Sequence, residues 1–145
     1  MCLPAAERHS LTRQGPSSAR LDAAQADSKA AHWRGIAVSA CEQCGRNRLP
    51  TIEVPRRLQN YLAESPAAGP RLLLEPESAA PPTPHTIGAV VEIAIGPEGG
   101  FAEEEIEALR LCGFEAMRLG PRVLRTETAA IAALSWLQSR YGDLG

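Results

Sequence analysis

Two loops contain the residue types in this sequence that could bind a ligand and act on it. The first has the sequence IGPEGGF at residues 95–101 and lies between a predicted strand and a predicted helix. Its glycines allow the backbone to approach a ligand closely and to adopt positive φ angles. It lacks the lysine and hydroxyl of a P-loop and the GxGxxG spacing of a dinucleotide site. An ordinary turn between strand and helix is an equal alternative for this segment.

The second loop has the sequence LGPRVLRTETA at residues 119–129 and again joins a predicted strand to a predicted helix. Two arginines, a glutamate and two threonines crowd the start of that helix. The free N–H groups of a helix N-terminus favour anions, so arginine is electrostatically mismatched there unless it reaches outward to an anionic partner. Taken alone, a solvated and salt-bridged turn is the more ordinary interpretation of this loop.

A third segment combines two cysteines with two arginines at the end of a predicted helix. Cys41 and Cys44 have the spacing of a redox or zinc motif, but no second pair of ligands follows at a matching distance. Because the same spacing spans one turn of an apolar helix face, we interpret both cysteines as packing residues and expect no metal. Arg46 and Arg48 follow directly, and cations are favourable at a helix C-terminus in any protein.

The elements that must position these loops alternate along the chain. Apolar extended segments are predicted at 49–54, 71–75, 87–95 and 114–119. Helices are predicted at 28–44, 56–63, 103–112 and 126–141. Such alternation favours an α/β fold with a parallel sheet, whose ligands bind beyond the carboxyl ends of the strands. The segment 87–95 gives the strongest strand signal, and because it is apolar on both faces apart from Glu92 it predicts a buried strand. Residues 1–27 show no lasting periodicity, and the proline-rich stretch 76–84 predicts a loop.

Composition and charge limit the possible partners. The 145 residues suit one globular domain, and no apolar run approaches the roughly 18 residues that a membrane helix needs, so we expect no membrane association. Residues 1–60 have nine basic side chains against five acidic ones, whereas residues 61–145 have six against twelve. An anionic partner is therefore expected at the first half or at individual arginines of the second. Residues 1–21 lack the apolar core of a secretory signal, which favours a reduced, cytoplasmic setting.

Together, the three segments resemble the catalytic domain of the RsmE-type ribosomal RNA (uracil-N3) methyltransferases of the SPOUT superfamily. The resemblance rests on the order and spacing of His32-Trp33-Arg34 with Ala40 to Arg46, then Ile95 to Phe101, then Leu119 to Ala129. It implies an α/β fold: a parallel sheet flanked by helices, with a deep trefoil knot in the C-terminal part. Residues 21–145 would form the SPOUT methyltransferase domain, with its first strand and helix missing or replaced. Residues 1–20 would be a poorly ordered or atypical start, and we expect no counterpart of the PUA-like domain of full-length members.

The resemblance also implies an activity, a cofactor and partners. The reaction would be S-adenosyl-L-methionine-dependent methylation of N3 of a uridine in 16S ribosomal RNA of the small subunit, performed in the cytoplasm by a homodimer. The implied catalytic residues are Arg125 with Glu127 or Glu98 as the base, and the implied RNA contacts are Arg46, Arg48 and Arg122. The implied cofactor-binding residues are Ile95, Gly96, Pro97, Gly99, Gly100, Leu119, Gly120, Leu124, Thr128 and Ala129.

Two other functions use the same sequence features. One is a truncated, non-catalytic remnant that dimerises or binds cofactor or RNA weakly. The other sets the resemblance aside and takes the chain as a nucleotide- or phosphate-binding α/β protein that uses the same two loops. The methyltransferase function needs the loops at 95–101 and 119–129 to lie together, so loops far apart in the structure would exclude that assignment.

Overall fold

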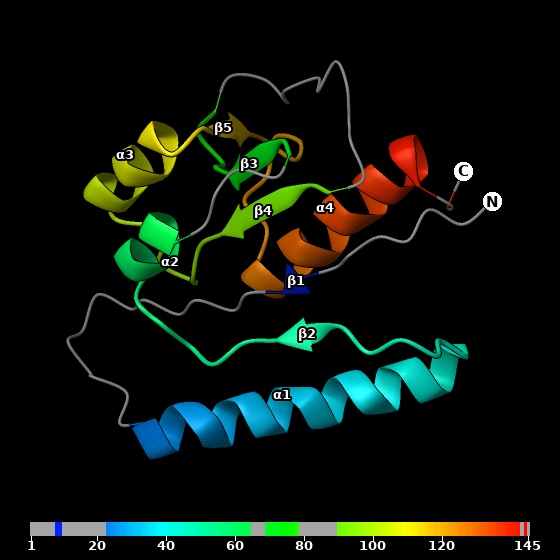
Figure 1. Cartoon of the computed structure of the whole chain (residues 1–145). Coiled ribbons are helices and arrows are strands. Elements are labelled where there is room, and N and C mark those ends of the chain that lie inside the picture. Colours follow the sequence, from blue (N-terminus) through cyan, green and yellow to red (C-terminus); the bar gives the residue numbers. More distant parts are fainter. Residues whose placement is uncertain (1–7, 10–22, 65–68, 79–89, 143, 145) are drawn as a thin grey trace. The chain divides into compact units, whose positions relative to one another are not determined.

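A computed structural model describes residues 8–9, 23–64, 69–78, 90–142 and 144 of the chain (Figure 1). The chain divides into two compact units, residues 7–63 and residues 64–145, and each is described by itself. Within the described residues, no helix is both long enough and apolar enough to span a bilayer.

Residues 64–145 form a three-stranded parallel sheet with two helices. The elements are β3 (Arg71–Leu74), β4 (Glu92–Ile95), α3 (Glu103–Leu111), β5 (Phe114–Met117) and α4 (Thr126–Tyr141). The strand order is β4-β3-β5, with both neighbours parallel to β3. The predicted alternation of strands and helices and the predicted parallel sheet are confirmed here.

The core of this unit is built on β3 rather than on β4. Leu72 and Leu73 of β3 are fully buried, and they share the core with Leu109, Phe114, Met117 and Ala133. The prediction that 87–95 is a buried strand is wrong for its described part, because all four residues of β4 are only half-buried. A strand paired on one side exposes more of its surface than the strand between two neighbours. Residues 87–89 lie outside the described residues.

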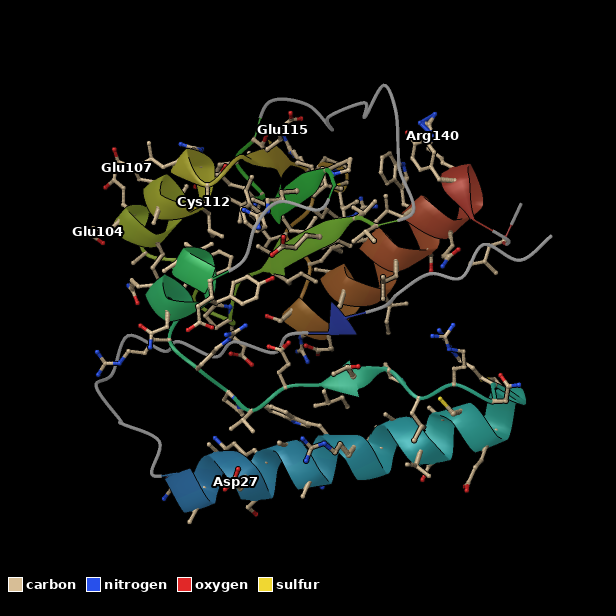
Figure 2. The ribbon with its side chains drawn as sticks, viewed as in Figure 1. Asp27, Glu104, Glu107, Cys112, Glu115 and Arg140 are labelled. Carbon is tan, nitrogen blue, oxygen red and sulfur yellow. The ribbon has the colours of Figure 1, made fainter. Side chains whose placement is uncertain are left out.

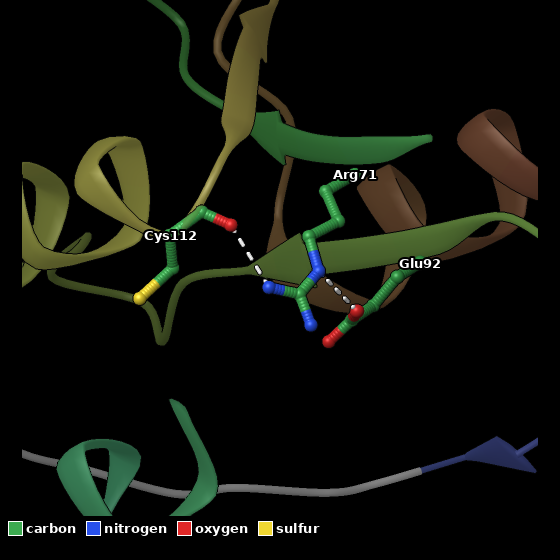
Figure 3. A network of polar contacts seen from close by, with 3 residues as sticks. All are labelled: Arg71, Glu92 and Cys112. Carbon is green, nitrogen blue, oxygen red and sulfur yellow. Dashed lines mark hydrogen bonds and ion pairs between the residues drawn. The ribbon is translucent and has the colours of Figure 1, made fainter. Parts of the chain in front are cut away.

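A buried arginine ties the three strands together at their first residues (Figure 3). Arg71 pairs in register with Glu92 on one side and with Phe114 on the other. Its Nε donates to Glu92 Oε2 at 2.8 Å, and its Nη1 donates to the Cys112 carbonyl oxygen, also at 2.8 Å. Its guanidinium carbon lies 5.2 Å from the centroid of the Phe114 ring. The side chain of this one residue therefore contacts both of its cross-strand neighbours and the turn that precedes β5.

The helices of this unit begin and end near their predicted limits. The Glu105 carboxylate accepts a hydrogen bond from the Ala102 N–H at 2.9 Å, which closes the first turn of α3. Three glutamates in that turn favour the positive end of the helix dipole. Glu104 and Glu107 point away from the sheet (Figure 2), whereas Leu109 packs against it. The last helix, predicted to begin at Thr126 or Glu127 and to end at about Tyr141, is confirmed and begins at Thr126.

Residues 7–63 contain α1 (Ala23–Cys44), α2 (Leu58–Glu64) and a short parallel pair, β1 (Arg8–His9) with β2 (Thr51–Ile52). The prediction that α1 begins at Ser28 is wrong, because the helix already includes Ala23. The alanines of this stretch have high helix propensity but create no apolar periodicity, so the early start left no pattern. The rest of residues 1–22 lies outside the described residues.

The buried face of α1 also differs from the predicted one. The buried residues are Ala26, Ala30 and Cys41, with Trp33 and Ala37 half-buried between them. Helical spacing in the sequence predicts one apolar face made of Trp33, Ile36, Ala37, Ala40, Cys41 and Cys44. Three of these residues, Ile36, Ala40 and Cys44, are exposed instead. The described α2 begins at Leu58 rather than Arg56, whose side chain pairs with Glu53 at 3.0 Å.

Replacing Arg71 with methionine should lower the free energy of unfolding by about 3 kcal/mol, because it leaves the Glu92 carboxylate and the Cys112 carbonyl without their partner. Urea unfolding followed by circular dichroism measures the change. Arg110→Met is the matched control, since the Arg110 pair with Glu75 is also 2.8 Å long but its arginine is 55% exposed. The control should cost less than about 1 kcal/mol. Equal losses in the two variants would contradict the anchoring role of Arg71.

Candidate functional site

The site is built at the carboxyl ends of the strands. Leu74, the last residue of β3, pairs with Ile95 of β4 and with Met117 of β5. All three strands therefore end at the same edge of the sheet, and the loops that follow β4 and β5 leave from one level. Because β3 lies between them, these loops begin about 10 Å apart, which is two strand spacings. This is the edge where ligands of parallel α/β sheets bind.

The first loop is folded tightly back on itself. The N–H of Gly100 donates to the Pro97 carbonyl at 2.8 Å, which closes a turn over residues 97–100. Gly100 has φ of +76°, a value that side chains disfavour. A Cβ on Gly96 would lie 3.2 Å from the backbone of Gly100 and from the Phe101 ring. A Cβ on Gly99, in contrast, would meet no atom within 4 Å.

The second loop is fixed by its own contacts as well. The Nε of Arg118 donates to the Gly120 carbonyl at 2.7 Å. At the far end of the loop, the carbonyl of Arg125 accepts the Ala129 N–H at 2.7 Å, which is the first hydrogen bond of α4. Arg125 is the N-cap residue of α4, but its side chain makes no capping hydrogen bond. The arginine side chain instead extends into solvent.

A hydrogen bond from the start of α4 joins the two loops. Thr126 Oγ1 donates to the Gly96 carbonyl oxygen at 3.1 Å in a partly buried position. Helix α4 also packs against β4. The chain that leaves β5 must therefore cross from the β5 side of the sheet to the β4 side between Arg118 and Arg125. The two loops that the sequence singled out thus lie together at the carboxyl edge.

The predicted site residues of this unit divide into a half-buried and an exposed set. The half-buried residues, which are mainly apolar, are Ile95, Gly96, Pro97, Leu119, Leu124 and Ala129. The exposed residues, which include every charged candidate of this unit, are Glu98, Gly99, Gly100, Gly120, Arg122, Arg125, Glu127 and Thr128. Such an arrangement can hold a flat, largely neutral ligand against backbone and apolar side chains while charged groups face solvent and a second ligand.

Arg46 and Arg48 belong to the other unit, where they follow α1 and are exposed. The Arg46 N–H donates to the Cys41 carbonyl at 2.9 Å as α1 ends. The thiol of the buried Cys41 donates to the Arg48 carbonyl at 3.7 Å, and that of Cys44 donates to the Cys41 carbonyl at 3.6 Å. Cys41 therefore packs as predicted, whereas Cys44 does not. The described part of the chain holds no cluster of three or more metal-ligating side chains.

Sequence reasoning missed Thr126 as a residue of this site. A hydroxyl residue at the start of a helix is normally expected to serve that helix, by capping its own backbone. Here the hydroxyl bonds to Gly96, thirty residues earlier in the chain. The sequence signal was limited to a threonine that follows a strand–loop segment, and it did not indicate the partner.

The comparisons with known proteins show the family of the chain. A family model described as RNA methyltransferase domain matches residues 13–138. The chain belongs to this family. It is 40% identical over 118 residues to a Ribosomal RNA small subunit methyltransferase E from Buchnera aphidicola subsp. Schizaphis graminum, covering 80% of this chain and 48% of the relative. It is 34% identical over 128 residues to the protein of that name from Bacillus subtilis, covering 82% and 50%.

Solved structures of similar proteins extend this result. A Ribosomal RNA small subunit methyltransferase E from Neisseria gonorrhoeae bound to S-adenosyl methionine has a TM-score of 0.79 at 32% identity, covering 95% of this chain and 56% of that one. A putative methyltransferase from Legionella pneumophila, in complex with the same cofactor, has a TM-score of 0.73 at 38% identity, covering 92% and 54%. This member of the RNA methyltransferase family spans about half the length of the relatives that it matches.

Gly100→Ala should lower the free energy of unfolding by about 1 kcal/mol, because its positive φ strains any side chain. Gly99→Ala is the matched control one residue earlier. No positive φ and no neighbouring atom oppose its methyl group, so its stability should change by less than about 0.5 kcal/mol. Urea unfolding compares both variants with the unsubstituted chain. A Gly99→Ala loss as large as that of Gly100→Ala would mean that the turn differs from the one described.

Proposed function

We propose that this chain is the catalytic domain of an S-adenosylmethionine-dependent methyltransferase that modifies N3 of a uridine in 16S ribosomal RNA. The observation that supports it most is the Thr126–Gly96 hydrogen bond, which brings the two loops of the family resemblance together at the carboxyl edge of one parallel sheet. Family membership and two similar structures that contain the cofactor support the same proposal. Ribosomal RNA as substrate implies the cytoplasm as location.

The residues present fit the cofactor. Its adenine and ribose are neutral and flat enough to lie against half-buried apolar residues, which Ile95, Pro97, Leu119 and Leu124 supply. The space beside Gly99 is open, so a ligand can approach the backbone where a side chain would stand. We expect backbone groups of both loops to form hydrogen bonds with the adenine and ribose, and Gly96, Gly100, Gly120, Thr128 and Ala129 to complete the binding residues.

The chain's charged residues would deprotonate the uracil and stabilise the charge that results. When bound, S-adenosylmethionine supplies an electrophilic methyl group on a positively charged sulfur. Uracil N3 carries a proton, which the carboxylate of Glu127 or Glu98 would accept and pass to water. Arg125 would stabilise the negative charge that the uracil ring gains when that proton leaves. These three side chains are exposed and therefore accessible to an RNA base.

Transfer of a labelled methyl group to small ribosomal subunits tests the proposed activity, and mass spectrometry of the digested RNA should identify 3-methyluridine. Arg125→Ala should lower turnover at least about 100-fold while leaving the unfolding midpoint unchanged. Arg140→Ala is the control, because Arg140 lies in the last turn of the same helix and points outward over Trp136 (Figure 2). Unchanged turnover in Arg125→Ala would exclude that residue from the mechanism.

Cofactor binding without any transfer would support the non-catalytic alternative instead. A calorimetric titration with S-adenosylmethionine, run beside the transfer assay, separates the two functions. Absence of binding would exclude both the methyltransferase function and a remnant that binds the cofactor.

Arginines in both units would bind the RNA backbone. Arg46 and Arg48 are exposed after α1, in the half of the chain where basic residues exceed acidic ones, and Arg122 is exposed in the second loop. Guanidinium groups suit phosphate oxygens, and the resulting affinity falls with salt because bound counterions are released. We propose these three residues as phosphate contacts.

We also propose that residues 21–145 form a SPOUT domain with a trefoil knot and that it acts as a homodimer. Helix α4 presents Ile131 and Leu134, which are 67% and 45% exposed, three residues apart on one side of the helix. A second copy would cover these apolar side chains. Both units of the chain would belong to the same methyltransferase domain.

Ile131→Asp should convert the dimer into a monomer, because a carboxylate in an apolar interface has no partner. Leu111→Asp is the matched control, since Leu111 is 83% exposed on α3 and should leave the dimer intact. Light scattering coupled to size-exclusion chromatography measures both masses. A dimer that survives Ile131→Asp but dissociates in Leu111→Asp would place the interface on α3.

A further inference from the structure

The Thr126 hydroxyl does not cap its own helix. Helix α4 begins at Thr126, and its N-cap is Arg125, so the threonine hydroxyl lies one position beyond the place where capping side chains act. Its hydroxyl donates to the Gly96 carbonyl oxygen, 3.1 Å away and thirty residues earlier in the chain. The hydrogen bond of the hydroxyl therefore joins the two loops rather than stabilising the start of the helix.

Hydrogen bonds within each loop fix the conformation of that loop but do not connect it to the other loop. The turn at 97–100 is closed by the Gly100–Pro97 hydrogen bond, and the second loop is held by the Arg118–Gly120 hydrogen bond. At their first residues, both loops are tied to strands that β3 separates. What these internal bonds leave undetermined is the placement of one loop relative to the other. The Thr126 hydroxyl restrains that placement.

The residues on either side of Thr126 are the ones with proposed chemical roles. Arg125 and Glu127 are both exposed, so their side chains make few contacts that could position them. Their backbone is nevertheless held, because the Thr126 hydroxyl is bonded to Gly96 and the Arg125 carbonyl is bonded to the Ala129 N–H. A displacement of Thr126 would move both charged residues relative to the glycine loop.

We propose that Thr126 is a positioning residue for methyl transfer, which holds Arg125 and the second loop in place against the glycine loop through the Gly96 carbonyl. This inference rests on the proposed function, since it assigns the two loops to one cofactor and one substrate. In this role Thr126 would act through the Gly96 carbonyl rather than by contacting the cofactor or the uracil. Its contribution is to keep the binding residues of the two loops at the separation that the ligand requires.

Two substitutions of Thr126 in the full chain separate positioning from simple stability. Thr126→Val keeps the shape of the side chain but removes the donor, whereas Thr126→Ser keeps the donor. In calorimetric titrations with S-adenosylmethionine, valine should weaken binding about tenfold, and serine should stay within about threefold of the unsubstituted chain. The Michaelis constant for the cofactor should rise in the valine variant by the same factor as its dissociation constant.

Ser78→Ala is the matched control, because Ser78 Oγ also donates to a backbone carbonyl, that of Ala116, at 3.3 Å. It should lower the unfolding midpoint in urea about as much as Thr126→Val while leaving cofactor affinity unchanged. Equal affinities of the valine variant and the unsubstituted chain would overturn the proposal, and so would an equal loss in the serine variant.

Hydrogen exchange distinguishes a failure of this inference from a failure of the proposed function. Without any ligand, Thr126→Val should speed amide exchange at residues 96–101 and 118–125, whereas Ser78→Ala should not. If the unsubstituted chain binds no S-adenosylmethionine, the proposed function is wrong, and faster exchange would then still support the link between the loops. Unchanged exchange in the valine variant would contradict that link whatever the chain binds.

Discussion

The geometry of the carboxyl edge depends on a contact at the opposite edge of the sheet. Arg71 begins β3, and its side chain contacts both of its register partners, Glu92 and Phe114. A slip of either neighbouring strand by one residue would move its partner to the other face and break that contact. Because β3, β4 and β5 each contain four residues, strands that start level also end level. The loops that follow β4 and β5 therefore leave the sheet at the same height.

Arginine is well suited to this anchor. Its planar guanidinium donates to the Glu92 carboxylate and to the Cys112 carbonyl at once, while its flat face lies over the Phe114 ring. Lysine has a single point of charge and could not meet the three partners in the same geometry. Burial of the charge is compensated because the carboxylate, which is itself partly buried, neutralises it. The anchor thus gives the sheet a defined register, but it carries a desolvation penalty that an apolar pair would not have.

Much of the unit at 64–145 could be predicted from local patterns. The apolar run at Arg71–Leu74, the acidic start of α3 and the helix at Thr126–Tyr141 depend on residues close in sequence, so periodicity and end signals were sufficient. The charged residues that crowd one helix start drew attention to the segment 119–129, although only the family resemblance assigned it to a binding site. Such features can be predicted from neighbouring residues alone, without knowledge of the rest of the chain.

The features that sequence reasoning missed are those that depend on distant partners. Strand order decides which apolar strand is buried, and the central place of β3 cannot be read from the composition of β4. The bonds of Arg71 to Cys112 and of Thr126 to Gly96 span 41 and 30 residues, and neither leaves a local pattern. On α1, neither the start of the helix nor its buried face could be predicted, because the small alanine side chains give no clear apolar stripe. Local chemistry was thus easier to predict than the contacts that assemble it.

The central claim is that the loops at 96–101 and 118–129 together form one S-adenosylmethionine site. Titration of the cofactor into the isotopically labelled chain, followed by amide resonances in NMR spectra, tests this claim most directly. The account predicts that the largest shifts fall within both loops and in the first turn of α4, with small shifts in α3. Shifts confined to one loop, or centred on residues outside both, would contradict it.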